Sequence, residues 1–213
     1  DTATYWSLFG QGVILLLIQI GGMGIITIAI AIAVVSGRKI GLMQRSTMQE
    51  AISAPTVGGI VRRTQFIIRT TILIEIIGAV LLAPVFCRDF GFWKGIWYSL
   101  FHSISAFCNA GFDLFGIRSH FSSLTSYSVQ PIVNLVIMML IIVGGIGFLT
   151  WDDLRANRLH WQKYRMQSKV IFMVTGILIF LPALYFFCFE FSNLPLTERV
   201  WVSLFQSVTP RTA

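Results

Sequence analysis

Four long runs of apolar residues alternate with polar segments along the chain and predict membrane-spanning helices. They cover residues 12–35, 66–86, 129–150 and 170–191. A helix rises about 1.5 Å per residue, so roughly 20 residues cross a hydrocarbon core about 30 Å thick, and each run is long enough. Arg69 and Glu75 interrupt the second run, and Pro182 in the fourth predicts a kink.

Two shorter apolar segments, residues 95–107 and 200–208, have a different character. As a helix, the first reaches only about 20 Å, which is too short to cross the membrane. It runs directly into a small, polar, glycine-containing turn. Non-helical backbone at membrane depth is tolerated only where it is buried in protein or lines a water-filled cavity. We therefore predict two re-entrant pore loops, the Trp97 loop (residues 97–112) and the Trp201 loop (residues 201–213).

Basic residues are concentrated in two linkers, which predicts the orientation of the helices. Residues 36–65 and 151–169 hold ten of the 16 Lys and Arg residues. Because cytoplasmic loops of membrane proteins are rich in Lys and Arg, we expect both linkers in the cytoplasm. The four spans then alternate correctly only if both short segments enter from the outer side and return to it. The charge pattern therefore supports re-entrant loops independently of segment length.

The composition agrees with an integral membrane protein and excludes other classes. Of the 213 residues, 55% are hydrophobic and 12% are charged, whereas soluble domains average about 25% charged residues. The net charge of +7 lies mainly in the linkers, where it determines topology and can face anionic lipid or a cytosolic partner; it predicts no nucleic-acid-binding surface. The three cysteines are scattered without metal-ligand spacing. We see no signal peptide, and expect both ends to continue in a longer chain.

Internal similarity predicts a repeated unit. The pattern WxSLFxS at residue 97 recurs at residue 201, an offset of 104, and GGxGxxT at residue 21 recurs at residue 144, an offset of 123. The unit is an outer helix, a re-entrant loop, an inner helix and a basic linker. Residues 1–65 hold the inner helix and the basic linker of a first unit. Residues 66–169 form a complete second unit, and residues 170–213 hold the outer helix and partial loop of a third. The units share one orientation, which disfavours inverted-repeat transporters.

Four residues that follow the first short helix are predicted to form part of a selectivity filter. The C-terminal end of a helix carries partial negative charge, which favours a cation near the bilayer centre. Carbonyl groups of extended residues replace the water shell of a dehydrated ion, and about four loops surround it. Glycine permits backbone angles that residues with a Cβ atom resist. The residues are Asn109, Ala110, Gly111 and Phe112.

Three segments, SISAFCNAGFDLFG, LIIVGGIGFLTWDDL and SLFQSVTPRTA, carry a specific resemblance to a known family. They resemble the second pore loop, its inner helix and the third pore loop of the Ktr/Trk/HKT potassium transporters, most closely the bacterial Ktr membrane subunit. FGQGVILLLIQIGGMGIIT is similar to that family's first inner helix, so the resemblance covers essentially the whole chain. It implies potassium uptake across the bacterial plasma membrane, often dependent on sodium as a coupling or activating ion.

The resemblance also implies an architecture and partners. The expected fold is all-α, with repeated helix–pore-loop–helix units around a pseudo-fourfold pore. The family's subunit usually forms a homodimer in the lipid bilayer and is regulated by a cytosolic ring that binds nucleotide. The first filter would then precede Asp1, and the fourth repeat and the gating segment of the third inner helix would lie outside this chain.

Carried over by position, the resemblance assigns filter residues in both loops. They are Asn109, Ala110, Gly111 and Phe112 in the second repeat, and Thr212 and Ala213 in the third. Potassium is expected to contact their backbone carbonyls only, and no other metal or cofactor is expected. Cys108 departs from the family pattern, which often has Asn just before the filter.

Two glycine clusters lie in the inner helices and have two alternative roles. Small residues chiefly let membrane helices approach closely, so we expect packing, with gating hinges as the alternative. The clusters comprise Gly21, Gly22, Gly24, Gly144, Gly145 and Gly147.

Isolated polar residues in the apolar segments are assigned mostly structural roles. Glu75 is expected either to pair with a base on another helix or to line the ion path, and Arg69 to extend toward the interface. His102 is expected to hydrogen-bond behind the filter, and Arg211 to brace the Trp201 loop. Interhelical hydrogen bonds are expected from two further residues, Gln19 and Asn134.

Two other classes of function compete with a cation transporter. A membrane-embedded enzyme would use His102 with Ser99 or Ser103, but no carboxylate is near in sequence to orient the histidine. Gln206 also replaces it in the Trp201 loop. A structural or sensory subunit would not need recurring glycine-bearing loops, so we expect a transporter and no enzyme. Within the transporter class, a true potassium channel or a sodium-conducting relative is the alternative.

Overall fold

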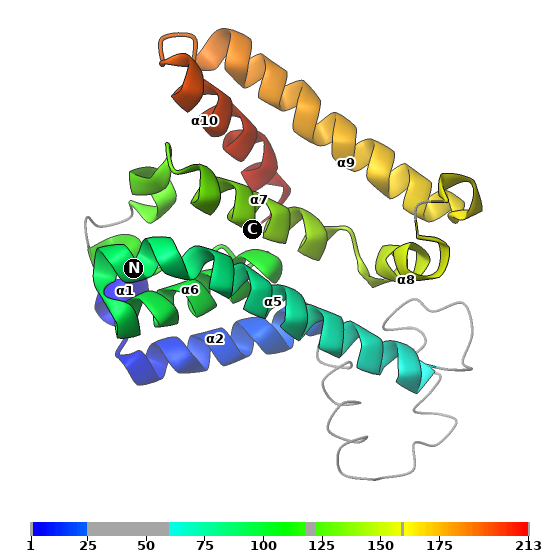
Figure 1. Ribbon diagram of the computed structural model, residues 1–213, viewed down its shortest axis with the longest axis horizontal. Helices are drawn as coiled ribbons and strands as arrows, with labels where there is room; N and C mark the ends of the chain where they lie inside the picture. Colours follow the sequence, from blue (N-terminus) through cyan, green and yellow to red (C-terminus); the bar gives the residue numbers. More distant parts are fainter. Residues whose placement is uncertain (1, 25–59, 118–121, 159, 213) are drawn as a thin grey trace.

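A computed structural model describes residues 2–24, 60–117, 122–158 and 160–212 (Figure 1). These residues form helices and connecting turns, as the apolar runs predict, with no strand among them. The α-helices are α1 (Thr2–Tyr5), α2 (Leu8–Met23), α5 (Ile60–Phe90), α6 (Phe92–Phe107), α7 (Pro131–Gly145), α8 (Phe148–Asn157), α9 (Met166–Tyr185) and α10 (Leu196–Val208). Short turns of other helix types are η1 (Phe115–Ile117), η2 (Ser123–Tyr127), η3 (Trp161–Lys163), η4 (Phe186–Glu190) and η5 (Thr209–Arg211).

Two helical segments are long and apolar enough to cross a membrane, Thr64–Phe90 and Met166–Glu190. They confirm the spans predicted over residues 66–86 and 170–191. Large apolar side chains project outward from both, as lipid-facing positions require; Phe180 of α9 is 72% exposed. The helix continues through Pro182, and its hydrogen-bonding pattern changes only at the π-helical turn η4.

Each long helix is followed by a shorter helix that folds back along it (Figure 1). The connection between the first long and short helices is very short, because α5 continues to Phe90 and α6 begins at Phe92 after the single residue Gly91. Gly95 of α6 then lies directly against the backbone of Cys87. At the far end of the chain, α10 returns from the end of α9 toward the middle of the molecule. Both short helices therefore end near the centre of the fold.

The apolar run over residues 129–150 is not one continuous helix, in contrast to the simple prediction. It forms α7, which breaks after Gly145, and the chain then bends by 95° into α8. Gly147 lies at the bend with φ +83°. The 15 residues of α7 rise only about 22 Å, so the straight part is shorter than a full span. The remainder of the predicted run belongs to a helix with a new direction.

The second basic linker, residues 151–169, has defined structure. Asp153 of α8 is 3% exposed and accepts hydrogen bonds from Ser168 Oγ at 2.6 Å and from the backbone N–H of Arg165 at 3.0 Å. The Arg165 guanidinium adds an ion pair at 3.3 Å. In addition, Arg155 stacks over the ring of Phe66 on α5 at 4.3 Å. The linker is therefore anchored to two helices. Residues 25–35 of the first predicted span and residues 36–59 of the first linker lie outside the described residues.

The core that positions the central loops lies where α5, α6 and α7 meet. Three of its rings, Phe86, Phe115 and Tyr127, pack edge-on or tilted with centroids 5.2–5.4 Å apart. Phe101 of α6 and Val133 of α7 are fully buried beside them. Apolar packing of this kind fixes the axis of α6 and so determines where its C-terminal end points.

Candidate functional site

The helical part of the Trp97 loop ends where the sequence predicts. α6 ends at Phe107, the last residue of the predicted short apolar segment. Cys108 and Asn109 form a turn, and the chain then runs without helical structure from Ala110 to Leu114, where η1 follows. Asn109 has φ +54° and Gly111 has φ +73°, so the backbone twice takes a conformation that favours glycine.

Hydrogen bonds from the preceding helix hold the loop close to its C-terminal end. Ala110 N–H donates to the Ser105 carbonyl at 2.9 Å, and Asn109 N–H donates to the Ala106 carbonyl at 3.1 Å. Ser105 Oγ donates to the Phe112 carbonyl at 2.7 Å. Within the part of the chain that the structure describes, no hydrogen bond reaches the carbonyl oxygens of Ala110 or Gly111.

His102 supports the loop from behind, as the sequence predicts. Its ring is 3% exposed and stacks on Phe115 with centroids 4.3 Å apart. Nδ1 lies 2.7 Å from the Tyr98 carbonyl, and Nε2 accepts from the Leu114 N–H at 3.2 Å. Because a carbonyl only accepts and an amide only donates, these contacts assign the proton to Nδ1.

These contacts leave His102 without the arrangement of a catalytic base. Ser99 Oγ donates to the Gly95 carbonyl and Ser103 Oγ donates to the Glu75 carbonyl, both at 2.7 Å. Both hydroxyl groups are therefore bonded to the backbone and not to the imidazole. A nucleophile and its base must lie within hydrogen-bond reach of each other, so the serine–histidine alternative has no geometric support.

The Trp201 loop meets the Trp97 loop at their tips. Thr212 Oγ1 donates to the Asn109 carbonyl at 3.0 Å. Arg211 braces this loop, as expected, because its Nη2 donates to Thr175 Oγ1 of α9 at 3.1 Å. Ala213, the last predicted filter residue, lies outside the described residues.

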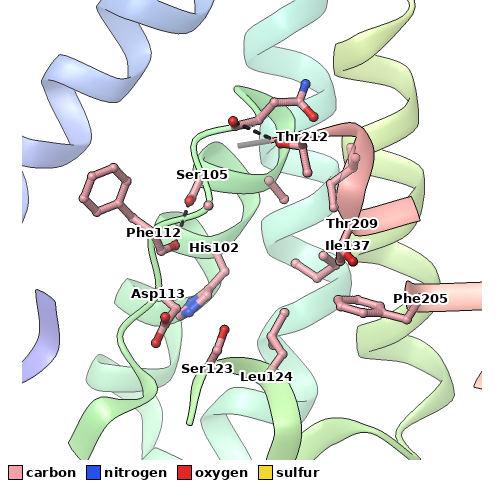
Figure 2. A pocket seen from close by; sticks show the side chains of 14 residues that line it. His102, Ser105, Phe112, Asp113, Ser123, Leu124, Ile137, Phe205, Thr209 and Thr212 are labelled. Carbon is pink, nitrogen blue, oxygen red and sulfur yellow. Dashed lines mark hydrogen bonds between the residues drawn. The ribbon is translucent and has the colours of Figure 1, made fainter. Parts of the chain in front are cut away.

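A cavity of about 200 Å³ lies between the two loops (Figure 2). Gly111, Thr212 and the hydroxyl-bearing residue Thr209 line it. Apolar side chains of α7 and α10 form its opposite wall, and the ring of Phe112 points away from it. The remaining labelled lining residues are His102, Ser105, Asp113, Ser123, Leu124, Ile137 and Phe205. Candidate filter residues of both loops, namely Asn109, Gly111, Phe112 and Thr212, therefore line one shared cavity.

Glycines of two inner helices lie against the end of α6. A Cβ atom on Gly22 of α2 would fall 2.4 Å from Cys108 Sγ, and one on Gly144 of α7 would fall 1.9 Å from the Phe107 carbonyl oxygen. A Cβ atom on Gly145 would make only an ordinary contact at 3.9 Å with Asn109 Nδ2.

The other three cluster glycines occupy different settings. Gly21 has no neighbouring atom within 4 Å of an added Cβ atom. Gly24 and Gly147 have positive φ angles of +80° and +83°, at the end of α2 and at the α7–α8 bend. The clusters thus combine close-packing positions with helix ends.

Glu75 has an amide partner in place of the base considered from sequence. It is 4% exposed, and Gln19 Nε2 of α2 donates to its two carboxyl oxygens at 2.9 and 3.1 Å. The interhelical bond predicted for Gln19 is confirmed. The one predicted for Asn134 is wrong, because its Nδ2 donates to backbone carbonyls of Tyr127 and Ser128 in the preceding connection. That amide fastens the loop before α7.

The spacing of the cysteines predicts no metal site. Within the described ranges no group of three or more His, Cys, Asp or Glu side chains is placed to hold a metal ion. Cys87, Cys108 and Cys188 are free thiols.

Long apolar helices, short helices that fold back along them and two loops that meet inside the fold define a multi-pass membrane protein of the transport class. A family model described as TrkH, a cation transport protein, matches residues 1–175. The chain belongs to this family of cation transport proteins. Membership confirms the resemblance seen in the pore-loop and inner-helix motifs, and it places the chain among transporters and not among enzymes.

Three curated relatives match over the whole chain. The Ktr system potassium uptake protein B of Bacillus subtilis is 41% identical over 219 residues, which cover 100% of this chain and 48% of the relative. The potassium/sodium uptake protein NtpJ of Enterococcus hirae is 38% identical, covering 100% and 47%. The Ktr system potassium uptake protein B of Vibrio alginolyticus is 30% identical, again covering 100% and 47%. This chain spans about half the length of the curated relatives it matches.

Proposed function

We propose that this chain is part of a potassium uptake transporter in which the Trp97 and Trp201 loops each supply part of a carbonyl selectivity filter. The observation that carries the proposal is the 3.0 Å hydrogen bond from Thr212 Oγ1 to the Asn109 carbonyl. It joins the tips of the two loops just beyond the ends of two similar short helices, α6 and α10. Loops that converge in this way are what a shared ion path requires.

The backbone of the Trp97 loop suits a dehydrated cation. The carbonyl oxygens of Ala110 and Gly111 have no hydrogen-bond donor among the described residues. Gly111 also lines the cavity between the loops, so its carbonyl oxygen is the strongest candidate ligand. The C-terminal end of α6, which stops at Phe107, adds partial negative charge close to these oxygens. Asn109 and Phe112 carbonyls already accept bonds, and we assign them a bracing role besides any contact with the ion.

The relatives favour potassium, with sodium as a second ion. Two of them carry the name potassium uptake protein, and one the name potassium/sodium uptake protein. We propose potassium as the substrate and sodium as a coupling or activating ion. A potassium channel or a sodium-conducting transporter is the second candidate, and the name of the Enterococcus hirae relative supports it.

The proposed assembly follows the family pattern. Four helix–loop–helix repeats surround one pseudo-fourfold pore, two subunits form a homodimer, and a cytosolic nucleotide-binding ring regulates transport. In the bacterial plasma membrane, linkers 36–65 and 151–169 face the cytoplasm and the loops enter from outside. The relatives' designation as a Ktr system agrees with several components, and the basic linkers supply charge for contact with the ring or with anionic lipid.

The test of the filter is Gly111→Ser in the full-length transporter, reconstituted into lipid vesicles with potassium and sodium uptake measured separately. A side chain at φ +73° strains the loop and turns its carbonyls, so we expect the potassium-over-sodium ratio to fall about tenfold, a change of about 1.4 kcal/mol. Assembly and expression are expected to remain intact.

Gly91→Ser is the matched control. Gly91 also has positive φ, +80°, and open space around an added Cβ atom, but it lies at the α5–α6 turn. This variant introduces the same residue at another glycine with positive φ, at a position away from the two loops. Wild-type selectivity in Gly111→Ser, or an equal loss in both variants, contradicts the filter assignment.

A further inference from the structure

Three side chains form a buried polar contact behind the Trp97 loop, and we name them the Glu75 cluster: Gln19 of α2, Glu75 of α5 and Cys108. We propose that Glu75 is a positioning residue for the filter, because it fixes the residue that immediately precedes Asn109. This inference rests on the proposed function of the loop and adds to it a named support that determines ion selectivity.

The bonds of Glu75 join three separate segments. Its carboxyl group accepts from Gln19 Nε2 at 2.9 and 3.1 Å and from Cys108 Sγ at 3.8 Å. Its backbone carbonyl accepts from Ser103 Oγ of α6 at 2.7 Å. One residue therefore ties the inner helix α2 and the outer helix α5 to the end of the short helix α6.

Glu75 takes part in no ion pair within the described residues. A carboxyl group inside a spanning helix is costly to keep, and such residues are usually retained for function. A purely structural contact between α2 and α5 would be served as well by apolar side chains, which often pack with equal or greater stability than buried polar pairs. The location of the bonds favours a role directed at the loop.

Glu75 acts through Cys108 and not by touching the ion. It does not line the cavity between the two loops, whereas Asn109 and Gly111 do. Gly22 of α2 packs closely against the thiol, because an added Cβ atom there would lie 2.4 Å from Sγ. Cys108 is thus held between α2 and the Glu75 carboxyl group, and this sets the start of the turn in which Asn109 takes φ +54°.

The test compares Glu75→Leu with Glu75→Gln in the full-length transporter, using potassium and sodium uptake in vesicles together with thermal unfolding. Leucine keeps much of the volume but removes both acceptors. We expect a potassium-over-sodium ratio lower by about tenfold, equivalent to about 1.4 kcal/mol, with a melting temperature unchanged or raised. Glutamine keeps an acceptor for the Cys108 thiol and pairs with Gln19 amide to amide, so we expect selectivity within about threefold of wild type, equivalent to about 0.65 kcal/mol.

Thr71→Val is the matched control on the same helix. Thr71 is fully buried, and its hydroxyl has no hydrogen-bond partner among the described residues. The change is also polar to apolar at similar volume, one turn from Glu75, and we expect wild-type selectivity.

Three outcomes overturn the inference. They are wild-type selectivity in Glu75→Leu, an equal loss in the Leu and Gln variants, or an equal loss in Thr71→Val. Gly111→Ser, measured in parallel, separates this inference from the filter proposal. If Gly111→Ser alters selectivity and Glu75→Leu does not, only the role of Glu75 is lost; if Gly111→Ser has no effect, the filter itself is wrong.

Discussion

Gly144→Ala is the smallest change that should disturb the Trp97 loop from a neighbouring helix. The added Cβ atom would lie 1.9 Å from the carbonyl oxygen of Phe107 and 2.9 Å from its carbonyl carbon. Both are backbone atoms, so no flexible side chain can move aside. Phe107 is the last residue of α6 and lies two residues before Asn109. The strain therefore acts directly on the start of the candidate filter.

The size of the effect follows from the geometry. The two atoms must separate by about 1.1 Å to reach 3.0 Å, below which real Cβ contacts essentially do not occur. Overpacking in well-packed interiors costs about 1–3 kcal/mol. Alanine also favours helix over glycine by about 1 kcal/mol, which offsets part of that cost. The adjacent variant Gly145→Ala carries the same helix preference, but its Cβ atom meets Asn109 Nδ2 at an ordinary 3.9 Å. The difference between the two variants therefore isolates the steric cost of about 1–3 kcal/mol.

The assay measures thermal unfolding of the purified full-length protein and the potassium-over-sodium uptake ratio in vesicles. We expect Gly144→Ala to be less stable than Gly145→Ala and less selective by about 5- to 150-fold, if the whole 1–3 kcal/mol appears in selectivity. Gly145→Ala should match or exceed wild-type stability. Equal stability and selectivity in the two variants would refute the close approach of α7 to the loop.

Two further variants test other contacts. Thr212→Val keeps the side-chain volume and removes the donor to the Asn109 carbonyl; a net loss of about 0.5–1.5 kcal/mol should lower the uptake ratio roughly 2- to 10-fold, while Thr212→Ser should restore it, and an unaffected ratio would argue against loop convergence. Ser168→Ala removes the 2.6 Å bond to buried Asp153; unfolding should become easier by about 1.5–3 kcal/mol with selectivity unchanged, and wild-type thermal stability would show that this bond does not anchor the linker.

The C-terminal ends of the two short helices were predictable from sequence, and their starts were not. α6 ends at Phe107 and α10 at Val208, where the apolar residues give way to small and polar ones. Their first turns contain Lys94 and Glu198, which the hydrophobic pattern excludes. The N-terminal turn of a helix accepts polar side chains, and an acid such as Glu198 is favoured there by the helix dipole. The hydrophobic pattern thus located the C-terminal end of each short helix and missed its N-terminal turn.

The bend between α7 and α8 was beyond the reach of the sequence pattern. The run over residues 129–150 stays apolar through the break, so its length alone predicts one span. The direction after Gly147 is set by contacts made in the folded state. Trp151 Nε1 donates to the Val143 carbonyl at 3.1 Å, and its ring packs on Phe107 with centroids 5.6 Å apart. The hydrogen bond crosses the bend over eight residues and the ring contact joins α8 to the end of α6; neither contact follows from the hydrophobic pattern.

The candidate site shows the same division between local and long-range information. Gly111 was identified because its residue type, its spacing after a short helix and the repeat all pointed to one backbone conformation, and it has φ +73°. The bond from Thr212 to the Asn109 carbonyl spans 103 residues, and the Gln19–Glu75 contact spans 56. Asn109 and Thr212 were identified as filter residues, and Gln19 and Glu75 as isolated polar residues, but both pairings depend on how the helices pack.

The two glycine motifs show how one sequence pattern serves different contacts. In the repeat that we propose, Gly21 corresponds to Gly144 and Gly22 to Gly145. The loop is nevertheless approached by Gly22 from α2 and by Gly144 from α7. A pair of adjacent glycines points in two directions about 100° apart around a helix axis. The glycine that closely approaches the Trp97 loop is therefore the second of the pair in α2 and the first of the pair in α7.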